Sequence, residues 1–131
     1  IADTWNEAVR KYDPNTGKVS TILGGLDIDE ARDGLPHVAT FAGLNDVTFD
    51  ESTGSLYIAD KMNNKIRKFA PNDRVSTIAG REKGHSDGMG LYSLFNLPGG
   101  ITMGPEGCIY VTDSCNHCVR KIEFRDDDDD E

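Results

Sequence analysis

The sequence lacks the long apolar runs and short signatures that mark membrane proteins and many enzymes. None of its 131 residues lies in an apolar run of about 18, which excludes a transmembrane helix. No charged segment followed by an apolar one opens the chain, so no targeting signal assigns a compartment. The common nucleophile, metalloprotease, phosphate-loop and dinucleotide motifs are absent. These absences favour a protein that is not an enzyme, and we predict no catalytic residue and no cofactor.

Basic residues are also scarce. Fourteen Lys and Arg stand against 23 Asp and Glu, giving a net charge of −9, and residues 126–131 supply six of the negative charges. Nucleic-acid binding needs a basic face, so the balance argues against a nucleic-acid partner. The acidic run predicts a solvated, disordered tail. A tail that binds cations or a basic partner is the alternative.

Cysteine is limited to three residues within a short stretch, Cys108, Cys115 and Cys118. The pair Cys115-x-x-Cys118 is half of a zinc site, and no second pair or suitably spaced His pair completes it. We therefore predict no metal site and interpret the cysteines as small residues in turn and strand positions. Oxidation of the two close thiols is the alternative.

What the sequence does contain is an internal repeat. The repeated unit is clearest in residues 56–80, LYIADKMNNKIRKFAPNDRVSTIAG. Residues 1–24 closely match this unit in sequence, and residues 109–124 match its first two thirds. A second pattern, 33–50, recurs at 87–104 with a constant spacing of 54. Self-similarity of this kind identifies the structural unit before any propensity is considered. The chain is a little over two repeats of about 55 residues.

The repeat predicts short strands joined by tight turns. The expected strands are 1–3, 8–13, 19–23, 46–49, 56–60, 65–69, 75–79, 101–103, 109–112 and 118–124. The middle unit supplies four, named a to d in chain order. Four antiparallel strands followed by a long crossing are the plan of a β-propeller blade. The chain then reads b-c-d, a-b-c-d and a-b-c: an all-β fold, a partial β-propeller of four-stranded antiparallel blades.

These strands set the expected domain boundaries. Residues 1–125 form the propeller segment, with blade boundaries near 1–24, 45–80 and 99–124, and residues 126–131 form the acidic tail. The chain begins with Ile1 inside a repeat, which indicates a fragment of a longer protein.

Polar residues recur at fixed positions of every unit. They are Asp3, Asp60 and Asp113; Asn6, Asn63 and Asn116; and Arg10, Arg67 and Arg120. The aspartate ends strand b, where it can accept hydrogen bonds from the turn or pair with a base of strand c. Repetition in every blade favours a structural role over a catalytic one. We expect the Arg and Lys stems of strand c to cover apolar surface while their charges point outward.

The three copies, with Asp-x-x-Asn before a Val or Ile and an Arg-Lys pair, closely resemble NHL repeats. The resemblance covers nearly everything except the acidic run, and it implies a six-bladed propeller. The chain departs from the pattern at Cys115, Cys118 and the turn Lys61-Met62. A closed ring would need on the order of 330 residues, so these blades cannot close alone. The last blade lacks strand d, and we interpret the chain as the C-terminal part of a propeller whose remainder is a natural partner.

Alternating strand directions place the b–c turns and the long d–a loops on one face, where we expect binding. The candidate residues are Trp5, Met62, Asn63, Asn64 and His117 in the turns, with His37 and His85 in the loops 27–37 and 81–92. Exposed aromatic and Met side chains suit a protein partner. The alternatives are that Trp5 and Met62 pack on their own loops and that the histidines are merely solvated.

We therefore predict a non-catalytic interaction scaffold or ligand-recognition segment. Because relatives of this propeller include lyases and hydrolases with a metal in the central channel, a fragment of such an enzyme is an alternative. An RNA-binding NHL propeller is the second alternative, and the acidic balance weighs against it.

Overall fold

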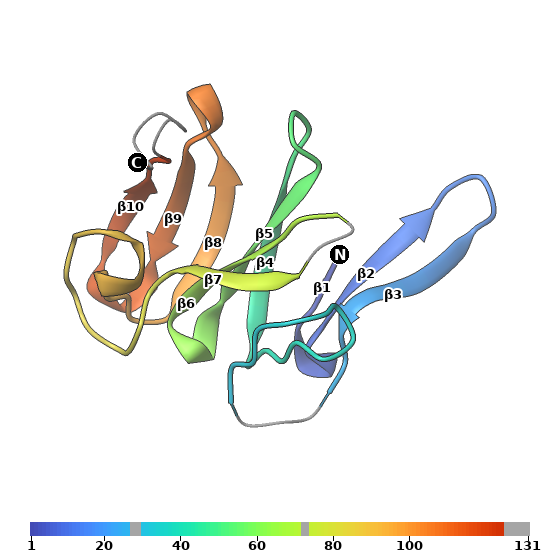
Figure 1. Cartoon of the computed structure of the whole chain (residues 1–131), viewed down its shortest axis with the longest axis horizontal. Coiled ribbons are helices and arrows are strands. Elements are labelled where there is room, and N and C mark those ends of the chain that lie inside the picture. The colour runs from blue at the N-terminus through green and yellow to red at the C-terminus, as the bar shows by residue number, and fades with distance from the viewer. Residues whose placement is uncertain (27–29, 72–73, 125–131) are drawn as a thin grey trace.

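The computed structural model of the chain describes residues 1–26, 30–71 and 74–124. The acidic run 126–131, predicted to be a tail, lies outside the described residues. The strands form three antiparallel sheets that stand side by side (Figure 1). These sheets are consecutive blades of an incomplete β-propeller.

Each sheet is a meander of neighbouring strands. The first blade contains β1 (Ala2–Asp3), β2 (Ala8–Asp13) and β3 (Lys18–Gly24). The second contains β4 (Leu44–Asp50), β5 (Ser55–Asp60), β6 (Lys65–Phe69) and β7 (Val75–Ala79). The third contains β8 (Pro98–Met103), β9 (Ile109–Asp113) and β10 (Cys118–Ile122). This order confirms the predicted b-c-d, a-b-c-d and a-b-c arrangement.

Two apolar clusters lie between the blades, one on each face of the central sheet. Alternate side chains of β5 belong to different clusters. Ile58 packs toward the first blade, whereas Tyr57 and Ala59 pack toward the third. Because successive side chains of a strand point to opposite faces, β5 is buried almost throughout. The central blade therefore shows no simple pattern of apolar and polar residues.

The b–c connections are single 3₁₀ turns, which refines the predicted tight turns. They are η1 (Thr4–Asn6), η2 (Lys61–Asn63) and η5 (Ser114–Asn116). Each ends in a residue with left-handed backbone, at φ of 52°, 56° and 54° for Glu7, Asn64 and His117. Two further 3₁₀ turns are η3 (Gly90–Tyr92) and η4 (Pro105–Gly107).

The b–c turns, the loop 80–97 and the described residues of the other long loop, 25–26 and 30–43, lie at one edge of the three sheets (Figure 1). The hairpin connections around 14–17, 51–54 and 104–107 lie at the opposite edge. We call the first edge the turn–loop face. Within the described residues, no helix is long and apolar enough to span a membrane.

Candidate functional site

The repeated Asp and Arg form a buried ion pair in the second blade. Arg67 donates from Nη1 to Oδ2 of Asp60 at 2.8 Å, and both side chains are fully buried. Asp60 also accepts from the backbone N–H of Ala42 and from Nδ2 of Asn63, each at 2.8 Å. Burial raises the pKa of the Asp60 carboxyl, because desolvation outweighs these hydrogen bonds and the nearby charge of Arg67.

The d–a loop encloses the arginine. Nη1 of Arg67 also donates to the Thr40 carbonyl at 2.8 Å, and Nη2 donates to the Arg32 carbonyl at 2.7 Å and to Asp33 at 2.9 Å. The guanidinium carbon lies 4.7 Å from the centre of the Phe41 ring, within cation–π range. The prediction that the charge of this arginine points outward is wrong. The guanidinium is buried, because the loop supplies carbonyl and carboxylate acceptors inside the fold.

The third blade repeats this enclosure around Arg120. Its guanidinium bonds to Asp113 and to the Leu94 and Ser86 carbonyls, at 2.8, 2.9 and 2.8 Å. It lies 4.6 Å from the Phe95 ring centre. Described residues of two different loops therefore fold around the same cation position.

The polar contacts of Asp113 also match those of Asp60. Asp113 accepts from the Asn96 N–H at 2.8 Å and from Asn116 Nδ2 at 2.7 Å.

The first blade has a looser version of the pair. Arg10 Nη1 lies 3.1 Å from Asp3 Oδ2, and Asn6 donates to the same oxygen at 2.8 Å. The Arg10 and Asp3 side chains are 32% and 30% exposed. No loop precedes this blade within the 131 residues, so the enclosure seen around Arg67 is missing.

Trp5 and Met62, two of the predicted binding residues in the turns, are largely exposed. Trp5 is 86% exposed and Met62 is 60% exposed. The Met62 side chain nevertheless borders Gly43, where an added Cβ would come within 2.8 Å of it. Met62 therefore packs partly on its own loop, whereas Trp5 projects into solvent.

The two predicted asparagines use their polar atoms inside the fold. Asn63 donates to Asp60, and Oδ1 of Asn64 accepts from the Leu97 N–H at 2.8 Å. Glu7 stands at the position of Asn64 one blade earlier, and its carboxylate accepts from the N–H groups of Gly43 and Leu44 at 2.9 and 3.3 Å. The left-handed residues of the first two turns thus reach the start of the next blade. Sequence reasoning missed Glu7 because this position differs in all three copies.

The predicted histidines are not brought together. His37, His85 and His117 are all exposed, and only His85 meets a cysteine, with Nε2 4.0 Å from Cys118 Sγ. All three cysteines are free thiols. Within residues 1–26, 30–71 and 74–124, no group of three His, Cys, Asp or Glu side chains is arranged to hold a metal ion.

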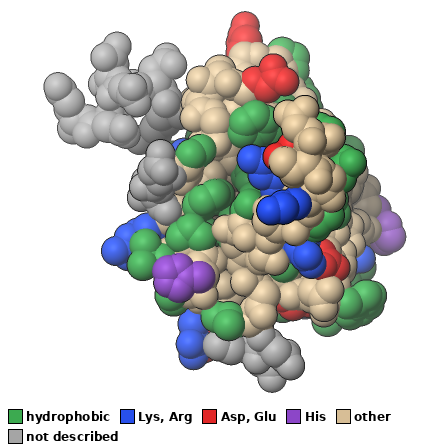
Figure 2. Space-filling model, turned by 90° about the vertical axis from the view of Figure 1, so that its right-hand side faces the viewer, with side chains coloured by type: hydrophobic (Ala, Val, Ile, Leu, Met, Phe, Trp, Pro, Cys, Tyr) green, Lys and Arg blue, Asp and Glu red, His purple; other side chains and the backbone are tan. Residues whose placement is uncertain are grey.

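Exposed apolar side chains also occur in the long loops of the turn–loop face. They are Leu26, Leu35, Val38, Met89, Leu91 and Tyr92. Tyr92 is 72% exposed. The sequence places these residues in the loops but does not distinguish them from loop residues that fold inward. Figure 2 shows hydrophobic side chains dispersed among polar ones on the side of the molecule it displays, without a single large apolar surface.

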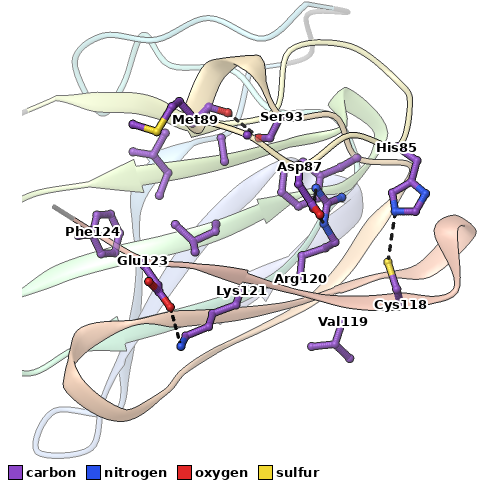
Figure 3. A pocket seen from close by; sticks show the side chains of 16 residues that line it. His85, Asp87, Met89, Ser93, Cys118, Val119, Arg120, Lys121, Glu123 and Phe124 are labelled. Atoms are coloured by element: carbon purple, nitrogen blue, oxygen red, sulfur yellow. Dashed lines mark hydrogen bonds and ion pairs between the residues drawn. The ribbon is translucent and has the colours of Figure 1, made fainter.

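A groove runs along β10 (Figure 3). Its volume is about 840 Å³. Its walls are β10, the end of β7 and the loop around Asp87. Asp87 meets Arg120 within it, and His85 meets Cys118 at one end (Figure 3).

Comparisons with known proteins agree with this geometry. The model of the NHL repeat matches residues 95–122. NHL repeat-containing protein 2 of Homo sapiens is 29% identical over 95% of this chain and 18% of its own length. Protein SUPPRESSOR OF QUENCHING 1, chloroplastic, of Arabidopsis thaliana is 30% identical over 100% of this chain and 13% of its own length. The chain thus spans less than a fifth of these curated relatives.

Solved structures share the fold. A structural genomics protein of unknown function from Bacteroides thetaiotaomicron superposes with a TM-score of 0.80 at 31% identity, covering 88% of this chain and 30% of that one. An auxiliary nutrient binding protein from Bacteroides ovatus superposes with a TM-score of 0.75 at 28% identity, covering 92% and 33%.

Proposed function

The chain belongs to the NHL-repeat family, and on that premise we propose that it is a non-catalytic scaffold that binds a protein partner through its turn–loop face. The face is built from three short turns and two long loops held by rigid sheets. Loops anchored on a rigid scaffold are where proteins commonly place recognition.

The observation that carries this proposal is the exposure of large apolar side chains on that face. Trp5, Met62 and Tyr92 are all largely exposed, and they come from two turns and a loop. Aromatic and Met side chains are enriched in protein interfaces, and truncation of such anchors commonly costs more than 1 kcal/mol. The face therefore offers several separate anchors to a partner.

The repeated charged groups support binding over catalysis. Asp60 and Asp113 are fully buried and hydrogen-bonded to Arg67 and Arg120. A general acid or base must reach its substrate, and these carboxylates face the protein interior. The metal-dependent alternative would draw ligands from several blades, most of which lie outside this segment.

The experiment begins with a partner recovered by pull-down and titrated against purified variants. Substitution of Trp5 and Met62 together by Ala should weaken binding by at least ~1 kcal/mol. The matched control is Tyr12→Ala with Val19→Ala, a cross-strand pair of exposed apolar residues in the first blade. The control should leave the affinity unchanged, because this pair lies near the hairpin connection 14–17, at the edge opposite the turn–loop face.

Deletion of residues 126–131 should alter mainly the salt dependence and the association rate, because rim charges act chiefly on encounter. Titrations at two salt concentrations separate these effects. If the tail deletion abolished binding while the Trp5 and Met62 substitution left it intact, the assignment of the face would be wrong.

A further inference from the structure

The second b–c turn and the loop 80–97 carry three lysines whose charge no carboxylate neutralises among the described residues. Lys61 begins η2, Lys65 begins β6, and Lys83 lies in the loop. Lys61 and Lys83 form no ion pair within the described part of the chain. Lys65 Nζ donates to the carbonyl oxygen of Arg81, which is a neutral acceptor. These three side chains, here called the lysine cluster, therefore keep their positive charge.

Hydrogen bonds hold the loop 80–97 between the second and third turns, at the edge of the sheets that forms the turn–loop face (Figure 1). Lys65 binds the start of the loop. Three residues further on, the carbonyl oxygen of Gly84 accepts from Asn116 Nδ2 of η5 at 2.8 Å. Lys83 lies between these two attachment points in the sequence. The lysine cluster therefore belongs to one part of the turn–loop face.

The carboxylates of the same loop are already paired with arginines. Glu82 pairs with Arg81 at 3.6 Å, and Asp87 pairs with Arg120 at 2.8 Å. Within the described residues of the preceding loop the pairing is similar, with Glu30 bound to Arg32 and Asp33 bound to Arg67. The lysine cluster is therefore a local excess of positive charge on a chain whose net charge is −9.

Exposed apolar side chains accompany the lysine cluster. Met62 lies in the second turn itself and is 60% exposed. Tyr92 is 72% exposed and belongs to η3. The first residue of η3, Gly90, accepts from the N–H of Gly80 at 3.3 Å, so this turn stands at the start of the loop, where Lys65 also binds. A partner at this place meets cations and apolar surface together.

We propose that the partner of the turn–loop face is an acidic protein segment that carries a large apolar side chain beside its carboxylates. The carboxylates meet Lys61, Lys65 and Lys83, and the apolar side chain packs on Met62. This inference rests on the proposed function, which makes the face a protein-binding surface. Complementary charge supplies selectivity and speeds association, and the apolar contact adds affinity that salt does not screen.

A nucleic acid is a poorer match for the same lysines. Nucleic-acid binding uses an extended basic stripe or face on a basic domain, whereas this cluster is confined to one turn and one loop of an acidic chain. The exposed Met62 side chain beside the lysines also suits an apolar side chain of a protein. The charge and the apolar contact therefore select the same class of partner.

The test titrates the full 131-residue chain against a fluorescent, capped peptide, Asp-Glu-Asp-Phe-Glu-Asp. Fluorescence anisotropy should show saturable binding that weakens at least about fivefold between about 0.05 and 0.5 M NaCl. A neutral peptide with Asn and Gln in place of Asp and Glu should bind about tenfold more weakly. A peptide with Ala in place of Phe should bind about threefold more weakly.

Protein variants test the lysine cluster. Lys61→Gln with Lys83→Gln should weaken the acidic peptide at least about fivefold. The matched control is Lys11→Gln with Lys18→Gln, which removes two exposed lysines from β2 and β3 and changes the net charge by the same amount. It should change the affinity less than about twofold. Lys65 is left in place because it also holds the loop, and thermal melts check that both variants remain folded.

The partner recovered by pull-down separates this inference from the proposed function. If that partner lost affinity for the Trp5 and Met62 variant but not for the Lys61 and Lys83 variant, the face would remain the binding site and the acidic class of partner would be wrong. If it lost affinity for neither variant, both would be wrong.

Three results with the probes would also overturn the inference. A neutral peptide that binds as tightly as the acidic one would show that the lysines select nothing. A single-stranded oligouridine RNA that binds more tightly than the peptide would make a nucleic acid the occupant. Deletion of residues 126–131 that strengthens peptide binding more than about tenfold would make this chain's own acidic run the occupant.

Discussion

Arg67 Nη1 lies 2.8 Å from Asp60 Oδ2, and neither side chain reaches solvent. The cost of removing two such charges from water is repaid only when further hydrogen bonds satisfy both groups. The acceptors of the d–a loop and the donors of the turn supply such bonds, and only Nε of Arg67 has no partner among the described residues. The pair therefore joins the adjacent strands β5 and β6 to loop residues that lie 18 to 35 positions earlier in the sequence.

Arg67→Ala should destabilise the chain by about 3–5 kcal/mol, because it leaves Asp60 buried without its counterion. Arg10→Ala removes the equivalent arginine of the first blade, where the ion pair is about a third exposed. This substitution should cost only about 0–1 kcal/mol. Urea unfolding of both variants measures the difference. Equal losses would contradict the importance of the enclosing loop.

Gly80→Ala should cost at least about 2 kcal/mol, because φ is 87° and the new Cβ would meet the Asn64 carbonyl oxygen at 2.3 Å. Gly17→Ala is the control, since its φ of 73° is similar and nothing lies within 4 Å. It should cost about 1 kcal/mol from backbone strain alone. The comparison by chemical unfolding isolates the collision, and similar losses for both would show that the backbone shifts freely.

The isolated chain should not behave as a stable, closed monomer. The β10 edge is open, and the outer faces of the first and third blades have no neighbouring blade within the described residues. Unpaired edges and uncapped repeats favour association or unfolding. Sedimentation and thermal melting test this. A cooperative monomeric melt above roughly 60 °C, high for a mesophile domain, would contradict it.

Asp50 should titrate below its ordinary pKa of 3.8, chiefly because the Ser52 hydroxyl donates to it at 2.7 Å. A pKa lowered by folding adds stability that is present above 3.8 and is lost as the pH falls through the folded value. Ser52→Ala should move the Asp50 pKa back toward 3.8, and Thr53→Ala should move it less. Carboxyl NMR titration reads both shifts. No change in Ser52→Ala would show that another contact sets the pKa.

The strand order could be predicted because equivalent strands of the repeated unit have similar sequences. Val19–Ile22 and Val75–Ile78 share a sequence, and each forms an outer strand. Strand ends were harder: β8 begins at Pro98 and β10 ends at Ile122, against predicted limits of 101 and 124. These ends depend on pairing across the sheet, which sequence periodicity does not contain.

The direction of the arginine side chains could not be predicted. Arg67 has the spacing of an ordinary strand residue, and its burial depends on Arg32, Thr40 and Phe41 of a distant loop. The groove was likewise invisible, because it results from a strand that is absent from the described residues. The contact of His85 with Cys118 joins a loop to a strand 33 residues apart, and no motif signals it.

The enclosure of Arg67 by the preceding loop has a consequence for how such arrays can gain or lose units. Arg67 belongs to the second sheet, and its partner Asp33 belongs to the loop before that sheet. The unit that must be inherited as a whole is therefore a loop and the blade that follows it, and this unit begins directly after an outer strand. Recombination just after Gly24 and Gly80 would remove or duplicate the cation, its counterions and its strand together. Breakpoints inside the loops would separate them and leave the arginine with the aspartate of its own blade but without its loop acceptors. We expect tolerated length variation among related chains to cluster at those two glycines.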